Sequence, residues 1–250
     1  MQIKFYRNWL ILGILIALFA SGCSSLGQVQ PHEVKPVAPA ELPSGNGWWR
    51  VRFRMNWPAD TEPVWHMDLY LAHQVIRPLL DKNKADINLW RFHRRAKRDL
   101  AGRQFTFFFY APPRTAQQIF DALQSNPILI DTASAGVIDD IVYDNPADIT
   151  RPGIDDASDK SWPLVIQRNW PYYITGVSQM WLHLVVEVAE RDLKDHRPAS
   201  LEEIDAFYRQ VDETVTELWQ KNGRHAFLHH LNAVFEYQPL IYWEKRYMDF

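Results

Sequence analysis

The strictest pattern in the chain is an alternation of apolar and polar side chains over residues 49–56, WRVRFRMN. Trp49, Val51, Phe53 and Met55 take every second position, and arginine or asparagine takes the others. Because successive side chains of a β-strand point to opposite faces, this pattern predicts a strand that buries an apolar face and exposes a basic one. The fold must therefore contain a sheet that is covered on one side.

The residues that follow predict the remaining elements of such a sheet. Apolar residues recur at helical spacing over 64–81 and 114–125. Two strands rich in aromatic residues are predicted at 87–95 and 103–110, joined by a polar hairpin loop, and a fourth strand at 137–143. The order β-α-β-β-α-β predicts an α+β fold with a ferredoxin-like antiparallel sheet.

The pattern changes to helical spacing in the last third of the chain. Residues 146–170 are rich in aspartate and proline and predict an irregular connection. Pro171 suits the first turn of the helix that follows, and residues 171–250 are predicted to be helical. Within this region a capping box at Ser200 begins a second helix, which we expect to stop at Asn222-Gly223, and a third helix is predicted at 224–235.

The first 23 residues carry a different signal. Lys4 and Arg7 precede an uncharged apolar run from Trp9 to Ala20, and the only cysteine of the chain, Cys23, follows two small residues. The run is shorter than the ~20 residues that span a bilayer and is typical of a signal peptide. With its cysteine, the segment resembles the lipobox of bacterial lipoproteins. The alternatives are an ordinary secretory signal and a buried helix.

The resemblance implies cleavage before Cys23 and acylation of this residue. Because Ser24 rather than aspartate follows the cysteine, it also implies sorting to the outer membrane, with the body facing the periplasm. The membrane is then a partner through the acyl chains on Cys23, and no cofactor is predicted. The predicted organisation is a signal peptide (1–22), an acylated, proline-rich tether (23–47), a ferredoxin-like part (48–145), an irregular connection (146–170) and a helical part (171–250).

Charge is divided unevenly along the chain. Residues 44–110 contain 12 lysines and arginines against 6 acidic residues, whereas residues 111–250 contain 12 against 22. The arginines of the predicted strands form a candidate anion-binding face for an envelope protein or an anionic glycan or lipid. Nucleic acid is excluded by the predicted location and by the net charge of -3. The candidate residues are Arg50, Arg52, Arg54, Arg91, Arg94 and Arg95.

The alternative role of these arginines is internal. We expect acidic residues of the helices after residue 171 to pair with Arg50, Arg52 and Arg54, because exposed arginines on a strand otherwise only face solvent. Charge alone would hold such an interface loosely. Aromatic anchors such as Trp90 or Phe92 are therefore expected to share it.

Candidates for catalysis or metal binding are few. Asp139 and Asp140 form a carboxylate pair of the kind used in glycoside hydrolysis. His225 and His229 have the spacing of zinc ligands on a helix, but position 226 lacks the glutamate of a zincin. His183 is expected to be a hydrogen-bonded core residue. Several tryptophans are candidates to line a groove, namely Trp48, Trp49, Trp57, Trp65, Trp90, Trp162 and Trp170.

A second resemblance concerns the predicted strands. The runs INLWRFHRR, FTFFFY and VYDNPADITRPG are similar to the C-terminal domain of lantibiotic dehydratases and thiopeptide-type biosynthesis proteins. This similarity implies a role in peptide maturation. The chain lacks the family's His-Leu-Arg strand and its Tyr-Gly-Gly, so no catalytic residue is carried over.

Two functions follow from the sequence. The first is a tethered periplasmic binding or envelope-assembly module without catalysis, whose working surface is the basic sheet face. The second is an envelope enzyme that acts on glycan or peptide through carboxylates such as Asp139 and Asp140 near a tryptophan-lined cleft.

Overall fold

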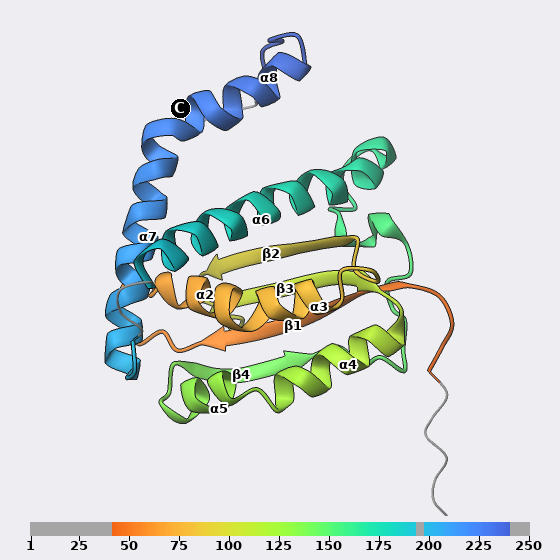
Figure 1. Ribbon diagram of the computed structural model, residues 1–250. Coiled ribbons are helices and arrows are strands. Elements are labelled where there is room, and N and C mark those ends of the chain that lie inside the picture. Colours follow the sequence, from red (N-terminus) through yellow and green to blue (C-terminus); the bar gives the residue numbers. More distant parts are fainter. Residues whose placement is uncertain (1–41, 194–197, 241–250) are drawn as a thin grey trace, which may run out of the picture. The chain divides into compact units, whose positions relative to one another are not determined.

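The computed structural model describes residues 42–193 and 198–240 (Figure 1). The predicted signal peptide, Cys23 and most of the predicted tether lie outside the described residues. Within the described ranges, no helix is both long and apolar enough to cross a membrane.

Four strands form one antiparallel sheet in the order β2-β3-β1-β4. They are β1 (Gly47–Met55), β2 (Leu89–Ala96), β3 (Arg103–Ala111) and β4 (Ile138–Tyr143). The predicted hairpin is confirmed, since β2 pairs with β3 antiparallel. All four predicted strands are present, with ends that differ by at most two residues.

Two helical segments cover one face of the sheet (Figure 1). The first consists of α2 (His66–Tyr70), the π-helical turn η1 (Leu71–Ile76) and α3 (Arg77–Lys82). The second consists of α4 (Pro113–Gln124) and α5 (Pro127–Ser134). The apolar residues of β1, Trp49, Val51 and Phe53, are almost completely buried beneath them. The alternation over residues 49–56 therefore identified the covered face correctly.

Helix α5 was missed by the sequence analysis, although its first residues carry a signal. The Asn126 side chain caps the helix by accepting hydrogen bonds from the backbone N–H groups of Ile128 and Leu129. Pro127 occupies the first turn, where a missing N–H costs nothing. An asparagine followed by a proline is a recognised helix start.

The next helix, α6 (Leu164–Leu193), begins earlier than predicted. Pro171 lies inside it rather than in its first turn. A proline has no N–H to donate to the carbonyl four residues earlier, which here belongs to Gln167. The Ser158 hydroxyl donates a hydrogen bond of 2.6 Å to that carbonyl instead. The connection predicted at 146–170 is correspondingly shorter and contains the 3-10 turn η2 (Ile154–Ala157).

Helix α6 packs along the free edge of β2, the outermost strand. The backbone N–H groups of Trp90 and Phe92 donate hydrogen bonds of 3.1 Å to the hydroxyls of Thr175 and Ser178. These groups would otherwise be unpaired at a sheet edge. The rings of Phe92 and Trp181 also meet edge to face. The predicted aromatic anchors Trp90 and Phe92 are confirmed.

Helix α7 (Leu201–Gly223) follows, capped by Ser200 as predicted. It packs on α2 and α6, and two buried histidines link it to the first helical segment. His66 Nε2 lies 2.7 Å from Asp205 Oδ1, and the Tyr208 hydroxyl lies 2.9 Å from His73 Nδ1. The sheet and these C-terminal helices therefore share one hydrophobic core.

The predicted stop at Gly223 is wrong, whereas the helical conformation predicted for 224–235 is present over Arg224–Val234. Gly223 has helical backbone angles, and the chain continues into the π-helical turn η3 (Arg224–His229) and α8 (His230–Val234). A Cβ atom at this position would lie 2.7 Å from the Trp219 ring. The glycine is therefore explained by close packing of Trp219. In Figure 1 the helix bends here and extends beyond α6.

Candidate anion-binding site

The face of the sheet opposite the helices carries cations in rows. Arg50 and Arg91 both lie opposite Phe108, Arg52 and His93 both lie opposite Thr106, and Arg54 and Arg95 both lie opposite Gln104. Because β3 runs between β1 and β2, each row places a β3 side chain between two basic ones. We call this surface the basic face; it consists of Arg50, Arg52, Arg54, Arg91, His93 and Arg95.

At the hairpin end of the basic face, the arginines are occupied by the hairpin loop. Arg54 Nη2 donates a hydrogen bond of 3.3 Å to the carbonyl of Leu100. Arg95 pairs with Asp99 and donates to the carbonyl of Gly102 at 2.9 Å. These two arginines therefore hold the loop in place.

At the opposite end, one carboxylate serves two guanidinium groups. Arg50 Nη2 lies 3.2 Å from Asp144 Oδ1, and Arg151 pairs with the other carboxylate oxygen. The backbone N–H of Arg50 also donates to Asp144 Oδ2 at 3.0 Å. Asp144 follows β4 directly, so it lies at the edge of the basic face.

Arg52 and Arg91 have no such partner. Neither makes a hydrogen bond or ion pair with any described residue, and the Nε atom of each is buried and unpaired. The Arg91 guanidinium lies 3.9 Å above the Phe108 ring and 5.0 Å from the Trp170 ring. Asp144 pairs with Arg50 and Arg151, and the charges of Asp144 and Asp140 act on Arg52 from a greater distance, whereas no ion pair joins Arg91 to a described carboxylate.

Burial, and secondarily the neighbouring cations, lowers the pKa values of Arg91 and Arg52. Burial, reinforced by the nearby charge of Arg151, lowers the pKa of Arg91 to about 10. Burial and the neighbouring Arg50 also lower the pKa of Arg52. Both groups remain protonated near neutral pH. Since a lowered arginine pKa reflects a destabilised cation, an added anion would be stabilised here.

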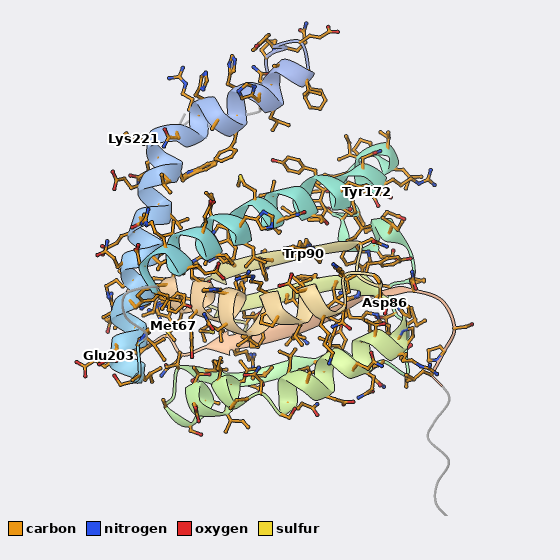
Figure 2. All side chains as sticks on the ribbon, in the orientation of Figure 1. Met67, Asp86, Trp90, Tyr172, Glu203 and Lys221 are labelled. Atoms are coloured by element: carbon orange, nitrogen blue, oxygen red, sulfur yellow. The ribbon has the colours of Figure 1, made fainter. Side chains whose placement is uncertain are left out.

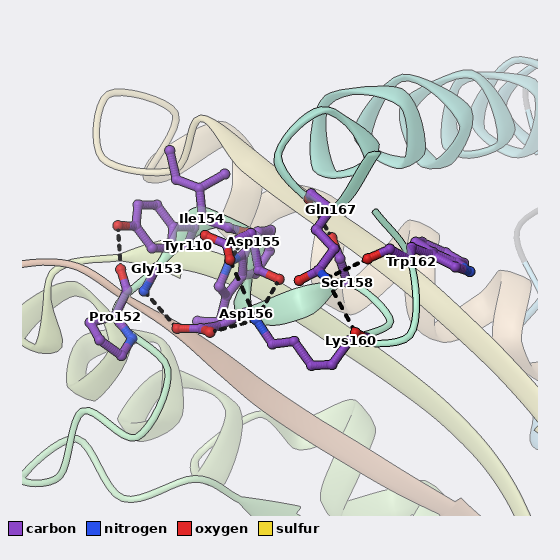
Figure 3. Close-up of polar contacts among 11 residues, drawn as sticks. Tyr110, Pro152, Gly153, Ile154, Asp155, Asp156, Ser158, Lys160, Trp162 and Gln167 are labelled. Atoms are coloured by element: carbon purple, nitrogen blue, oxygen red, sulfur yellow. Dashed lines mark hydrogen bonds and ion pairs between the residues drawn. The ribbon is translucent and has the colours of Figure 1, made fainter. Parts of the chain in front are cut away.

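Polar contacts hold the loop after Arg151 against β1 and β3, and Figure 3 shows several of them. The Trp48 indole N–H donates to the carbonyl of Ile154 and the Tyr110 hydroxyl donates to that of Pro152, both at 2.8 Å. Asp156 accepts a hydrogen bond from the Gly153 N–H and pairs with Lys160. The acidic residues of this loop therefore maintain its fold.

Arg94, predicted for the basic face, lies on the other side of the sheet. It faces Phe105 across the ladder, on the covered side, and its Nε donates to Asp68 Oδ2 at 2.8 Å. Arg103, which the sequence analysis did not single out, donates to Asp68 Oδ1 at 2.6 Å. Adjacent arginines at 94 and 95 must point to opposite faces, so strand parity could have separated them.

The expected pairing of β1 arginines with acidic residues of the later helices is wrong. Among the described residues, Asp205 pairs with His66 and Arg209, and Glu190 with Arg77. The reason is geometric: α7 packs on α2, and α6 packs on the edge of β2 and reaches the basic face only through Trp170, beside Arg91, and not with an acidic side chain.

The structure does not place Asp139 and Asp140 in one cavity. Asp140 lies opposite Arg54, whereas Asp139 is left unpaired by a register shift in the ladder between β1 and β4. Asp139 lines a shallow recess of about 600 Å³ that also contains Trp57, and Asp140 does not line it. Two carboxylates that act on one glycosidic bond must face a common site.

Trp48 and Trp49 are buried. Trp90, although only 9% exposed, borders a cavity of about 400 Å³ together with Thr175 and Leu182 of α6, and none of the other six tryptophan candidates lines that cavity.

The histidine candidates are placed as follows. His225 and His229 stack with ring centroids 5.3 Å apart on the π-helical turn after α7. Across residues 42–193 and 198–240, no three potential ligands gather into a metal site. His183 is exposed, contrary to the expectation of a core position, because α6 turns it away from β2.

Sequence reasoning missed two members of the arginine cluster. Arg151 lies in the segment predicted to be irregular (146–170) and Asp144 lies just before it, after the end of the predicted strand, where spacing gives no information about contacts. Comparisons of the chain with protein-family models, with characterised proteins and with solved structures found no match, so the functional interpretation depends on the geometry of the site.

Proposed function

We propose that this chain is a lipid-anchored envelope protein whose body binds anionic groups on the basic face, without catalysis. The observation that carries the proposal is the pair of unpartnered guanidinium groups, Arg52 and Arg91, beside the Arg50–Asp144–Arg151 cluster. Partly buried charges without partners are costly, and a bound anion would offset that cost.

The chemistry of arginine narrows the ligand. A guanidinium group presents a planar fork of donors that matches the oxygen atoms of phosphate or carboxylate. We infer a ligand that carries such groups, on an envelope lipid, a glycan or an acidic protein. Asp144 occupies part of the cluster and holds Arg50 and Arg151 in a fixed position.

The proposed function includes the position of the protein in the cell envelope. The apolar run before Cys23 and the small residues beside it support acylation of this cysteine, and Ser24 supports an outer-membrane position facing the periplasm. Replacing Cys23 by serine should abolish incorporation of labelled palmitate. Incorporation into that variant would refute the anchor.

We further infer that the sheet with α2–α5 is ferredoxin-like. The element order and the position of β1 between β3 and β4 support this assignment. The helices between β1 and β2 and between β3 and β4 both cover one face, which leaves the basic face open to a ligand.

The anion site is tested by titrating the full chain, in detergent micelles, with inorganic pyrophosphate. Arg52→Gln and Arg91→Gln should each weaken binding about 10-fold or more, because a charge-assisted hydrogen bond contributes ~1.5–3 kcal/mol. Arg54→Gln is the matched control, since Arg54 already bonds the Leu100 carbonyl.

Binding should also weaken as salt is added, because the attraction is between charges. Citrate serves as a second probe that carries carboxylates instead of phosphates. The site would be refuted if neither pyrophosphate nor citrate bound at low salt. An equal loss in Arg54→Gln would show diffuse attraction to the whole face rather than a defined cluster.

A further inference from the structure

The first turns of α6 carry a second apolar face. The exposed fractions are 66% for Val165, 49% for Ile166, 58% for Tyr172 and 49% for Tyr173. Residues seven apart lie on the same side of a helix, so these four side chains form one stripe. The opposite side of α6, with Gln167, Pro171 and Ser178, is buried against the body. We call the exposed stripe the α6 outer face.

This face lies at the end of the body where β1 begins. The Trp48 N–H donates to the carbonyl of Arg151 at 2.9 Å, and the segment after Arg151 reaches α6 through Ser158 and Gln167. Figure 2 labels Tyr172 near this end of α6. In the acylated chain of the proposed function, which this inference builds on, residues 23–41 with the acyl chains on Cys23 are covalently joined to the body at this end.

The charges of α6 differ from those of the rest of the chain. From Leu164 to Val186 the sequence contains no acidic residue and one arginine, Arg168, in a chain with a net charge of -3. Trp162 and Trp170 pack together beside this stretch, with ring centroids 5.5 Å apart. Tyrosine and tryptophan beside aliphatic residues, without negative charge, are typical of helices that lie on a bilayer surface.

We propose that the α6 outer face contacts the surface of an anionic lipid bilayer. Val165 and Ile166 enter the acyl boundary, and Tyr172 and Tyr173 place their hydroxyls at the level of the headgroups. Arg168 pairs with lipid phosphate. The helix lies on the membrane rather than across it, since its other side is packed against β2. This contact is separate from anion binding by the basic face.

The test uses the full acylated chain in vesicles of phosphatidylcholine and phosphatidylglycerol. The photoreactive amino acid p-benzoylphenylalanine is placed at Val165 or Tyr172, and as matched controls at Ile130 on α5 or Leu100 in the hairpin loop, which are 53% and 100% exposed. We expect crosslinks to phospholipid at the two α6 positions and only background at the two controls. Equal crosslinking at all four positions would overturn the proposal, as would crosslinking of α6 to protein alone.

A second variant tests the chemistry of the contact. Val165→Asp places an acid on the exposed stripe and should reduce lipid crosslinking from Tyr172, whereas Ile130→Asp should leave it unchanged. Circular dichroism confirms that each variant is folded. Val165→Asp should bind pyrophosphate with the same affinity as the wild type, and Arg91→Gln should retain crosslinking to lipid. A failure of the lipid contact can therefore be distinguished from a failure of the anion site on the basic face. Unchanged crosslinking in Val165→Asp would overturn the lipid contact.

Discussion

At the scale of single residues, Asp68 is the carboxylate on which the covered side of the sheet depends. It is completely buried and accepts hydrogen bonds from Arg94 Nε and Arg103 Nη2. Two atoms of the buried Arg103 side chain, Nε and Nη1, already lack partners. Losing Asp68 would leave a buried guanidinium group without its counter-charge.

Asp68→Ala should therefore lower the free energy of unfolding by about 3–5 kcal/mol, the range for breaking a buried ion pair. Chemical denaturation measures this loss. The control is Asp99→Ala, which removes the exposed partner of Arg95 and should lower the free energy of unfolding much less. A cost below ~1 kcal/mol for Asp68→Ala would contradict the role assigned to this carboxylate.

At the scale of elements, α6 shows how a long helix tolerates an internal proline. Pro171 leaves the Gln167 carbonyl without its helical donor, and Ser158 supplies a hydroxyl from the preceding loop. Ser158→Ala should cost about 1–3 kcal/mol, because it leaves a buried acceptor unpaired. Pro171→Ala restores an N–H at this point.

A double-mutant cycle in urea checks the coupling between the two positions. In the Pro171→Ala background, the cost of Ser158→Ala should be markedly smaller than in the wild type, since the helix then supplies its own donor. Independent, additive costs would show that the Ser158 hydroxyl does not replace the missing N–H. Ser161→Ala is a control in the same loop.

At the scale of the whole molecule, histidines join the first helical segment to the C-terminal helices. His73 is buried in η1, with the Tyr208 hydroxyl and Gln74 at its Nδ1 and Glu190 3.9 Å from its Nε2. Burial, with Arg77 as the second cause, lowers the pKa of His73. The unfolded chain therefore takes up this proton more readily than the folded one.

This contribution to stability is present above the unfolded pKa of ~6.5 and is lost as the pH falls below it. Denaturation midpoints between about pH 7.5 and 5.5 should decrease less in His73→Gln than in the wild type. His183→Gln, at an exposed position of α6, should keep the wild-type dependence. A steeper decrease in His73→Gln would show that protonation of His73 favours the folded state.

The sequence by itself determined the features that depend on neighbours along the chain. Alternation at residues 49–56 separated the buried from the basic side of β1, and helical spacing located α4 and the body of α7. The alternation of side chains within β2 also assigns Arg94 and Arg95 to opposite faces, although the sequence analysis named both as candidates for the same anion-binding face. These patterns are readable because side-chain direction in a strand or helix follows from local backbone geometry.

Only the tertiary structure decided which residues meet. Strand pairing placed β3 between β1 and β2, so that basic residues about 40 positions apart form rows across Phe108, Thr106 and Gln104. It also placed Arg151 beside Asp144 and α6 on the edge of β2, where Ser158 made an internal proline acceptable. The physical reason is that burial and hydrogen bonding are satisfied across the whole core, and periodicity along the chain does not encode which partner satisfies them.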